Sequence, residues 1–197
     1  MFLRSLTLIM LMTAFFAVPR AYAEGAFVDE LRFGIVAANP EFLEHDHPEG
    51  DQFGVNAEVL FKPFNLDRRA APSRDLVRTL LSPRLHVGAD VNFDEDGTSL
   101  VYSGLTWQQD ITDQLFVEAS FGLSLNNGKE NGRVENRELT RARLGSHVLF
   151  REQIALGYRV TETMNVVLSV SHNSHARLFD HANRGLTNIS LKTGFRF

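Results

Sequence analysis

The sequence of 197 residues contains no cysteine, a single tryptophan and, after its first 25 residues, no long apolar run. Without cysteine the chain has no disulfides and no thiol chemistry, so burial and hydrogen bonding must hold its fold together. Because no later stretch approaches 18 uninterrupted apolar residues, a helical membrane protein is excluded. The formal net charge of −4 gives no indication of a nucleic-acid partner.

The start of the chain has the pattern of a secretory signal peptide. Arg4 precedes an apolar run over residues 6–18, and the small residues Ala21 and Ala23 follow it. We predict a signal peptide over residues 1–23 that is cleaved after Ala23, because the run is too short to span a bilayer comfortably. No cysteine is present at this junction, which excludes a lipoprotein. The mature chain, residues 24–197, is of a length that suggests one domain.

Apolar and polar residues alternate with a period of two along the mature chain. In PRLHVGADVNF, residues 83–93, one face is apolar and the other carries Arg84, His86, Gly88, Asp90 and Asn92. A face of charge and glycine is unsuited to the core of a soluble sandwich, but it suits the polar lumen of a barrel whose apolar side meets lipid. Segments of this kind lie at 31–38, 53–62, 83–93, 98–108, 113–124, 143–159, 163–174 and 186–197.

These eight segments predict an all-β, eight-stranded antiparallel transmembrane β-barrel in the outer membrane of a Gram-negative bacterium. With the amino terminus in the periplasm, the links that face the cell exterior are 39–52, 94–97, 125–142 and 175–185. The link at 63–82 then faces the periplasm, and its DLVRTLL segment predicts a short amphipathic helix. Trp107, Tyr102 and Tyr158 are candidates for interfacial girdles, although ordinary packing explains a lone tryptophan equally well.

Side chains capable of catalysis gather at the end of the seventh segment, in SVSHNSHARLFDHANRGL at 169–186. The parity of the lipid-facing Leu168 and Val170 continues to His172 and Ser174, so both should face outward at the exterior boundary of the membrane. A histidine and a serine two residues apart on one strand face are the arrangement in which a base takes a proton from a hydroxyl nucleophile. Ester groups of outer-leaflet lipid would lie at this height.

This stretch resembles the lipid A 3-O-deacylase family of outer-membrane barrels, which is related to the acyloxyacyl hydrolases. The matching residues are His172, Ser174, Ala176, Leu178, Asn183, Gly185 and Leu186. GLTWQQDITDQLFVEASFG at 104–122 and VLFREQIALGYRV at 148–160 also resemble the family's middle strands, so the resemblance covers most of the mature chain. It implies an esterase that hydrolyses an ester-linked acyl chain of lipopolysaccharide, with Ser174 as nucleophile, His172 as base and no cofactor or metal.

Two positions depart from the family pattern. Thr187 stands where the family places the acid that orients the histidine, and His175 stands where it places an asparagine that helps the oxyanion. Asp180 is an alternative source of the acid. By the resemblance, the oxyanion or substrate-positioning residues are His175, Ala176, Asn183 and Gly185.

Other functions remain open from the sequence. A non-catalytic barrel with a structural or lipid-binding role would also fit the pattern, and so would a palmitoyl-transferring barrel, although that chemistry does not predict the His-x-Ser and Asn-x-Gly motifs. The EHDHPEGD stretch at 44–51 has side chains that can hold a divalent ion, but a solvated loop has the same composition. Lipid A and the outer membrane are the expected partners, with no nucleic acid, and a homodimer is left open.

Overall fold

A computed structural model of the chain describes residues 27–40, 52–64, 76–94, 97–128, 144–175 and 185–197. Within these residues all eight predicted segments form strands, and the predicted short helix is present as α2 (Leu76–Leu80). The strands are β1 (Val28–Ala38), β2 (Gln52–Phe61), β3 (Arg84–Asn92), β4 (Leu100–Asp110), β5 (Leu115–Asn126), β6 (Val148–Arg159), β7 (Met164–Ser174) and β8 (Leu186–Arg196). The predicted signal peptide lies outside the described residues.

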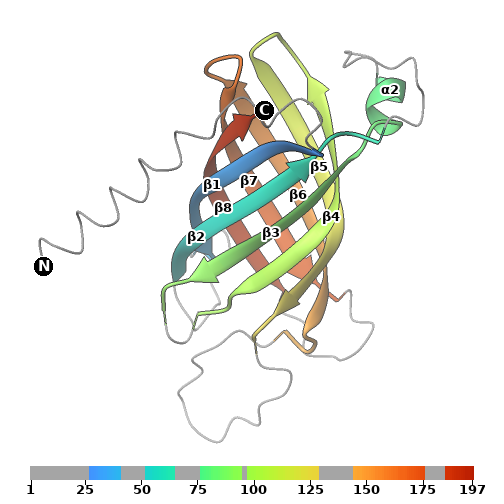
Figure 1. Cartoon of the computed structure of the whole chain (residues 1–197). Coiled ribbons are helices and arrows are strands. Elements are labelled where there is room, and N and C mark those ends of the chain that lie inside the picture. Colours follow the sequence, from blue (N-terminus) through green and yellow to red (C-terminus); the bar gives the residue numbers. More distant parts are fainter. Residues whose placement is uncertain (1–26, 41–51, 65–75, 95–96, 129–143, 176–184) are drawn as a thin grey trace, which may run out of the picture.

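The eight strands form a closed antiparallel barrel (Figure 1). Each strand pairs with its neighbours in sequence, and β1 also pairs with β8, from Glu30 opposite Arg196 to Ala38 opposite Asn188. Closure satisfies the backbone groups that an open sheet would leave unpaired at its edges, which is the condition for crossing a bilayer with strands. The predicted fold class is therefore confirmed.

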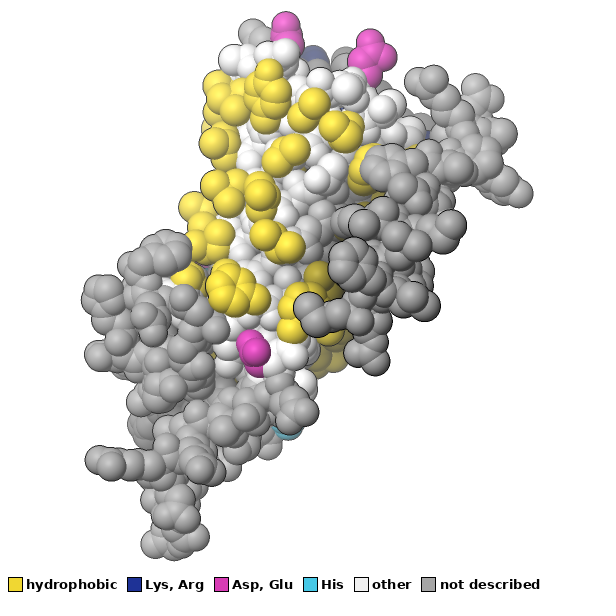
Figure 2. All heavy atoms as spheres, turned by 90° about the vertical axis from the view of Figure 1, so that its left-hand side faces the viewer, with side chains coloured by type: hydrophobic (Ala, Val, Ile, Leu, Met, Phe, Trp, Pro, Cys, Tyr) yellow, Lys and Arg dark blue, Asp and Glu magenta, His cyan; other side chains and the backbone are white. Residues whose placement is uncertain are grey.

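The barrel has an apolar outer surface and a polar lumen. On β3, Val87 is 45% exposed, whereas His86 and Asp90, on the alternate face of the strand, are buried inside. On β7, Leu168 is 49% exposed, and the alternating Ser169 is buried. Figure 2 shows the apolar side chains extending along one face of the molecule, with acidic side chains near its two ends. This inside-out polarity confirms that each apolar stripe points away from the protein, as it does in outer-membrane barrels.

The two ends of the barrel are distinguished by the elements that lie there. The amino- and carboxy-terminal ends of the barrel and α2 lie together at one end, which we name the periplasmic end (Figure 1). The opposite end, where β1 finishes at Ala38, β7 finishes at Ser174 and β8 begins at Leu186, is named the exterior end. None of the described helices is long and apolar enough to span a membrane.

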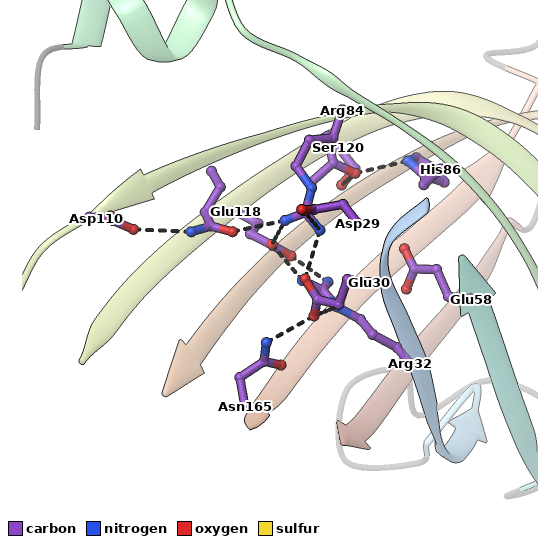
Figure 3. Close-up of polar contacts among 12 residues, drawn as sticks. Asp29, Glu30, Arg32, Glu58, Arg84, His86, Asp110, Glu118, Ser120 and Asn165 are labelled. Atoms are coloured by element: carbon purple, nitrogen blue, oxygen red, sulfur yellow. Dashed lines mark hydrogen bonds and ion pairs between the residues drawn. The ribbon is translucent and has the colours of Figure 1, made fainter. Parts of the chain in front are cut away.

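Ion pairs fill the lumen toward the periplasmic end (Figure 3). The guanidinium of Arg32 donates to both carboxylate oxygens of Glu118 at 2.7 Å, and its Nε donates to Glu30 at 2.6 Å. Lys192 pairs with Glu58 at 2.6 Å. Four buried carboxylates in the lumen face four buried cations, namely Glu30, Glu58, Asp90 and Glu118 with Arg32, Arg84, Arg151 and Lys192. The lumen is therefore a packed, charge-balanced core rather than an open channel.

Two details of the prediction are wrong. β6 begins at Val148 and not at residue 143, because Gly145 has a left-handed φ of 68° and interrupts the extended backbone before the strand. Tyr102 does not belong to an aromatic girdle, since it is 3% exposed and lies in the lumen. There its hydroxyl accepts a hydrogen bond from Asn56 at 2.8 Å, and the guanidinium of Arg151 lies 3.9 Å from its ring centre.

Candidate active site

His172 and Ser174 lie on the outward face of β7, at its exterior end. Both are half-buried, whereas Ser171 and Asn173, which alternate with them, are buried in the lumen. The predicted outward direction of the pair is therefore observed. No hydrogen bond joins the two side chains among the described residues, and the separation between such partners is often looser when no substrate is bound.

Thr187 contacts the imidazole of His172 directly. The two residues are paired across β7 and β8, and His172 Nδ1 lies 3.0 Å from Thr187 Oγ1, a hydrogen-bond distance. If Nδ1 carries the proton, it donates to the threonine hydroxyl, and the lone pair of Nε2 is left available to accept a proton. Thr187 thus occupies the place of an orienting residue, although its hydroxyl carries no charge.

Gly185 leaves room for the imidazole ring. Its φ is +73°, a conformation that residues with a side chain rarely adopt. A Cβ built at this position would lie 2.5 Å from His172 Cε1 and 2.9 Å from Nε2. Any other residue would therefore strain the backbone and push the imidazole ring of His172.

Asn173 ties this part of β7 to β8 from the lumen. Its Nδ2 donates to the carbonyl of Leu186 at 3.1 Å, and its Oδ1 accepts from Ser124 Oγ at 3.0 Å. Arg151 NH1 also approaches Oδ1, at 3.4 Å. Because Leu186 immediately precedes Thr187, this lumenal contact restrains the backbone that carries the Thr187 hydroxyl.

Asn39 restrains Thr187 from the other side. Its backbone N–H donates to the carbonyl of Thr187 at 2.7 Å, and its side-chain Oδ1 accepts from the Thr187 N–H at 3.0 Å. Asn39 has a φ of 48°, the left-handed region that asparagine tolerates better than most residues, and it is buried. No motif in the sequence connects Asn39 with the site.

Glu152 is a second residue that sequence reasoning missed. It is exposed on the outward face of β6, and the strand register places it directly opposite His172. Cross-strand neighbours have Cβ atoms about 5 Å apart. The signal was present in VLFREQIALGYRV, where Glu152 shares the parity of Phe150 and Ile154 and is therefore a charge on the apolar face.

The remaining predicted residues have different outcomes. His175, the first residue after β7, is fully buried. Ala176, Asn183 and the alternative acid Asp180 lie outside the described residues, as does the EHDHPEGD stretch. Within the described part of the chain, no group of three His, Asp or Glu side chains is placed to hold a metal ion.

Comparison with known proteins agrees with this architecture. The barrel is similar to the crystal structure of the outer membrane enzyme PagL, with 15% sequence identity, a TM-score of 0.55 and coverage of 85% of this chain and 99% of that one. It is also similar to the N-terminal β-barrel domain of Pseudomonas aeruginosa OprF, with 14% identity, a TM-score of 0.51 and coverage of 86% and 98%. At such identities these likenesses establish the fold.

The family is indicated by the sequence itself. A search of curated proteins finds no match. The family model described as lipid A 3-O-deacylase (PagL) matches residues 99–196, which run from just before β4 to the end of β8 and include His172, Ser174 and Thr187. The chain therefore belongs to the lipid A 3-O-deacylase family of outer-membrane β-barrels.

Proposed function

We propose that this protein is an esterase that removes an ester-linked acyl chain from lipid A in the outer leaflet, with Ser174 as nucleophile and His172 as base. The observation that carries the proposal is the outward-facing pair at the exterior end of β7, with His172 held by Thr187 at 3.0 Å. A site on the outer wall meets lipid laterally, so the substrate need not leave the membrane. We also propose that residues 1–23 are removed during export and that residues 24–197 form the mature barrel domain.

The reaction would proceed in two steps. Ser174 Oγ attacks the ester carbonyl carbon, and its proton passes to His172 Nε2. The imidazolium then returns this proton to the departing sugar oxygen as the ester C–O bond breaks, which leaves the acyl group on Ser174. Water that gives its proton to His172 attacks the acyl-serine, the fatty acid is released, and the serine regains its proton.

The positive imidazolium needs stabilisation in both steps. In serine triads the negative charge of an acid that is hydrogen-bonded to the histidine provides this stabilisation. Here Thr187 would hold the ring in the correct tautomer, and Glu152, opposite His172 on β6, would supply negative charge through space. The division of orientation and charge between two residues is compatible with a working but slower enzyme.

Apolar side chains beside Ser174 support an acyl substrate. The register places Phe150 opposite Ser174, and the rings of Phe150 and Phe121 are stacked with centres 6.2 Å apart. Leu123, opposite Phe150 on β5, is exposed. An acyl chain lying along these side chains would have its ester near Ser174. The residues proposed to support the oxyanion or to position the substrate are His175, Ala176, Asn183 and Gly185.

Mass spectrometry of lipid A tests the proposal. We expect cells that produce the wild-type chain to contain lipid A lacking one ester-linked acyl chain, and cells that produce Ser174→Ala to contain unmodified lipid A. Ser171→Ala is the matched control, because this serine lies on the same strand but faces the lumen, and it should behave as wild type. Migration of unheated samples in gels would verify that every variant forms a barrel.

Two results would contradict the proposal. Identical acyl patterns for wild type and Ser174→Ala would exclude Ser174 as nucleophile. Unmodified lipid A with wild type, both in cells and with purified protein in detergent, would support the alternative of a non-catalytic structural or lipid-binding barrel. The observation that favours this alternative is the neutral Thr187 at the position where the family resemblance places an acid.

A further inference from the structure

Helix α2 lies against the outside of the barrel wall. Trp107 and Gln109 belong to the outward face of β4, whose alternate residues Thr106 and Gln108 face the lumen. Trp107 Nε1 donates to the carbonyl of Leu80 at 3.2 Å, and Thr79 Oγ1 donates to Gln109 Oε1 at 2.8 Å. The helix is therefore fastened to the face of β4 that points away from the lumen, at the periplasmic end (Figure 1).

The helix exposes apolar side chains at this position. Leu76 is 63% exposed and Leu80 is 58% exposed, and Val77 and Leu81 beside them are also exposed. The polar Thr79 is instead the residue turned toward the barrel. This arrangement is the reverse of a helix that covers a soluble core, where the apolar side chains would pack inward.

The lipid-facing surface continues past the contact with α2. Trp107 lies opposite Ala119 on β5, and Ala119 in turn lies opposite Ile154 on β6. The side chain of Ile154 is 69% exposed. In the next outward-facing row, Gln109 lies opposite Val117 on β5, and Val117 lies opposite the exposed Leu156 on β6. The outer wall next to α2 is thus part of the apolar surface that meets hydrocarbon. In both rows the residues on β5 and β6, beyond the contact with α2, are apolar.

We propose that α2 is an interfacial helix that inserts Leu76 and Leu80 into the boundary between headgroups and acyl chains of the periplasmic leaflet. A short helix with one apolar side, held outside a barrel at the end of its lipid-facing surface, meets that boundary before it meets water. Trp107, whose amphipathic ring lies at the contact, is a residue type that favours the same depth. The proposal is independent of the proposed esterase activity.

Spin labels on single cysteines test this placement, since the natural chain has no cysteine to remove. Leu76→Cys and Leu80→Cys would be labelled in the full barrel reconstituted in phosphatidylethanolamine and phosphatidylglycerol vesicles. Leu168→Cys, in the lipid-facing surface of β7, is the matched control for hydrocarbon. Glu162→Cys, exposed in the turn between β6 and β7 at the same end as α2, is the matched control for water.

Collision with dissolved oxygen and with a water-soluble nickel complex gives the outcome. We expect the labels at Leu76 and Leu80 to collide with oxygen several times more than with nickel, as the label at Leu168 does, and the label at Glu162 to show the opposite. A nickel accessibility equal to that at Glu162 would overturn the proposal, because α2 would then lie in water. Low accessibility to both reagents would overturn it as well, because protein would then cover the helix.

Discussion

At the scale of single residues, the feature that distinguishes this site is a neutral side chain next to His172, the proposed base. Thr187 makes the contact with His172 Nδ1 that an acid would make, at 3.0 Å. In serine hydrolases with a triad, loss of the negative charge beside the histidine lowers turnover by about 10⁴-fold. Glu152, opposite His172 on the other neighbouring strand, is the described carboxylate that the register brings beside the imidazole.

We therefore predict opposite effects of two charge changes. Thr187→Glu should raise the rate of lipid A deacylation by at least tenfold, because it restores a charged hydrogen-bond acceptor at Nδ1. Glu152→Gln should lower the rate by about three- to tenfold, since its through-space interaction is screened at an exposed position. Both rates would be measured with purified barrels in detergent, using mass spectrometry of the released fatty acid.

The double variant separates the two roles. If Glu152 supplies the charge only because Thr187 does not, the effect of Glu152→Gln should largely disappear in the Thr187→Glu background. An unchanged rate for Glu152→Gln alone would show that this carboxylate has no part in the reaction.

At the scale of the elements, β7 presents two faces with different tasks. Its outward face carries His172 and Ser174, and its inward face carries asparagines that bind neighbouring strands from the lumen. Asn173 holds the carbonyl of Leu186 at 3.1 Å at the exterior end. Asn165, eight residues earlier on the same face, donates to Glu30 at 2.9 Å at the periplasmic end.

These two asparagines form a matched pair for mutation. Asn173→Ala and Asn165→Ala each remove a buried amide and should each lower the free energy of unfolding by about 1–3 kcal/mol. Only Asn173→Ala should also lower turnover, by about tenfold or more with little change in KM, because it releases the backbone that carries Thr187. Urea unfolding and steady-state kinetics would be measured on both variants. Equal losses of turnover would mean that Asn173 has no specific link to the site.

At the scale of the whole molecule, the closed barrel isolates its charges from both water and lipid. Arg32, Glu30 and Glu118 are nearly completely buried. Arg32 on β1 and Glu118 on β5 are 86 residues apart in sequence. Removing one partner of a buried ion pair leaves an uncompensated charge, which typically costs about 3–5 kcal/mol. The ionic core should therefore contribute more to stability than ion pairs at the ends of the barrel.

The contrast between two arginines checks this expectation. Arg32→Met should lower the free energy of unfolding by about 3–5 kcal/mol, because Glu30 and Glu118 lose their shared cation. Arg159→Met, which removes the partly exposed pair with Asp110 at the periplasmic end, should lower it by about 1 kcal/mol or less. Urea titration in lipid vesicles, followed by the fluorescence of the single Trp107, would give both values. Similar values for the two variants would contradict a central role for the lumenal network.

Strand count, strand direction and the face of most side chains follow from the sequence. Alternation is a property of the extended backbone itself, so it predicts the outward face of Val87, Leu168 and His172 without any knowledge of how the strands pair. The predicted start of β6 is wrong because the alternation does not reveal the left-handed backbone at Gly145. Tyr102 was misassigned because an aromatic residue suits both an interface and a lumen that offers an amide and a guanidinium.

Contacts between strands were decided only by the tertiary structure. The four-residue turn between β6 and β7 sets a register that places Glu152 opposite His172, and counting back from that turn would have predicted the pair. No such count predicts that Arg32 meets Glu118 across the lumen or that Asn39 holds Thr187. These contacts depend on the closure of β1 onto β8 and on the stagger of the whole ring, whereas the sequence by itself determined the direction in which most side chains point.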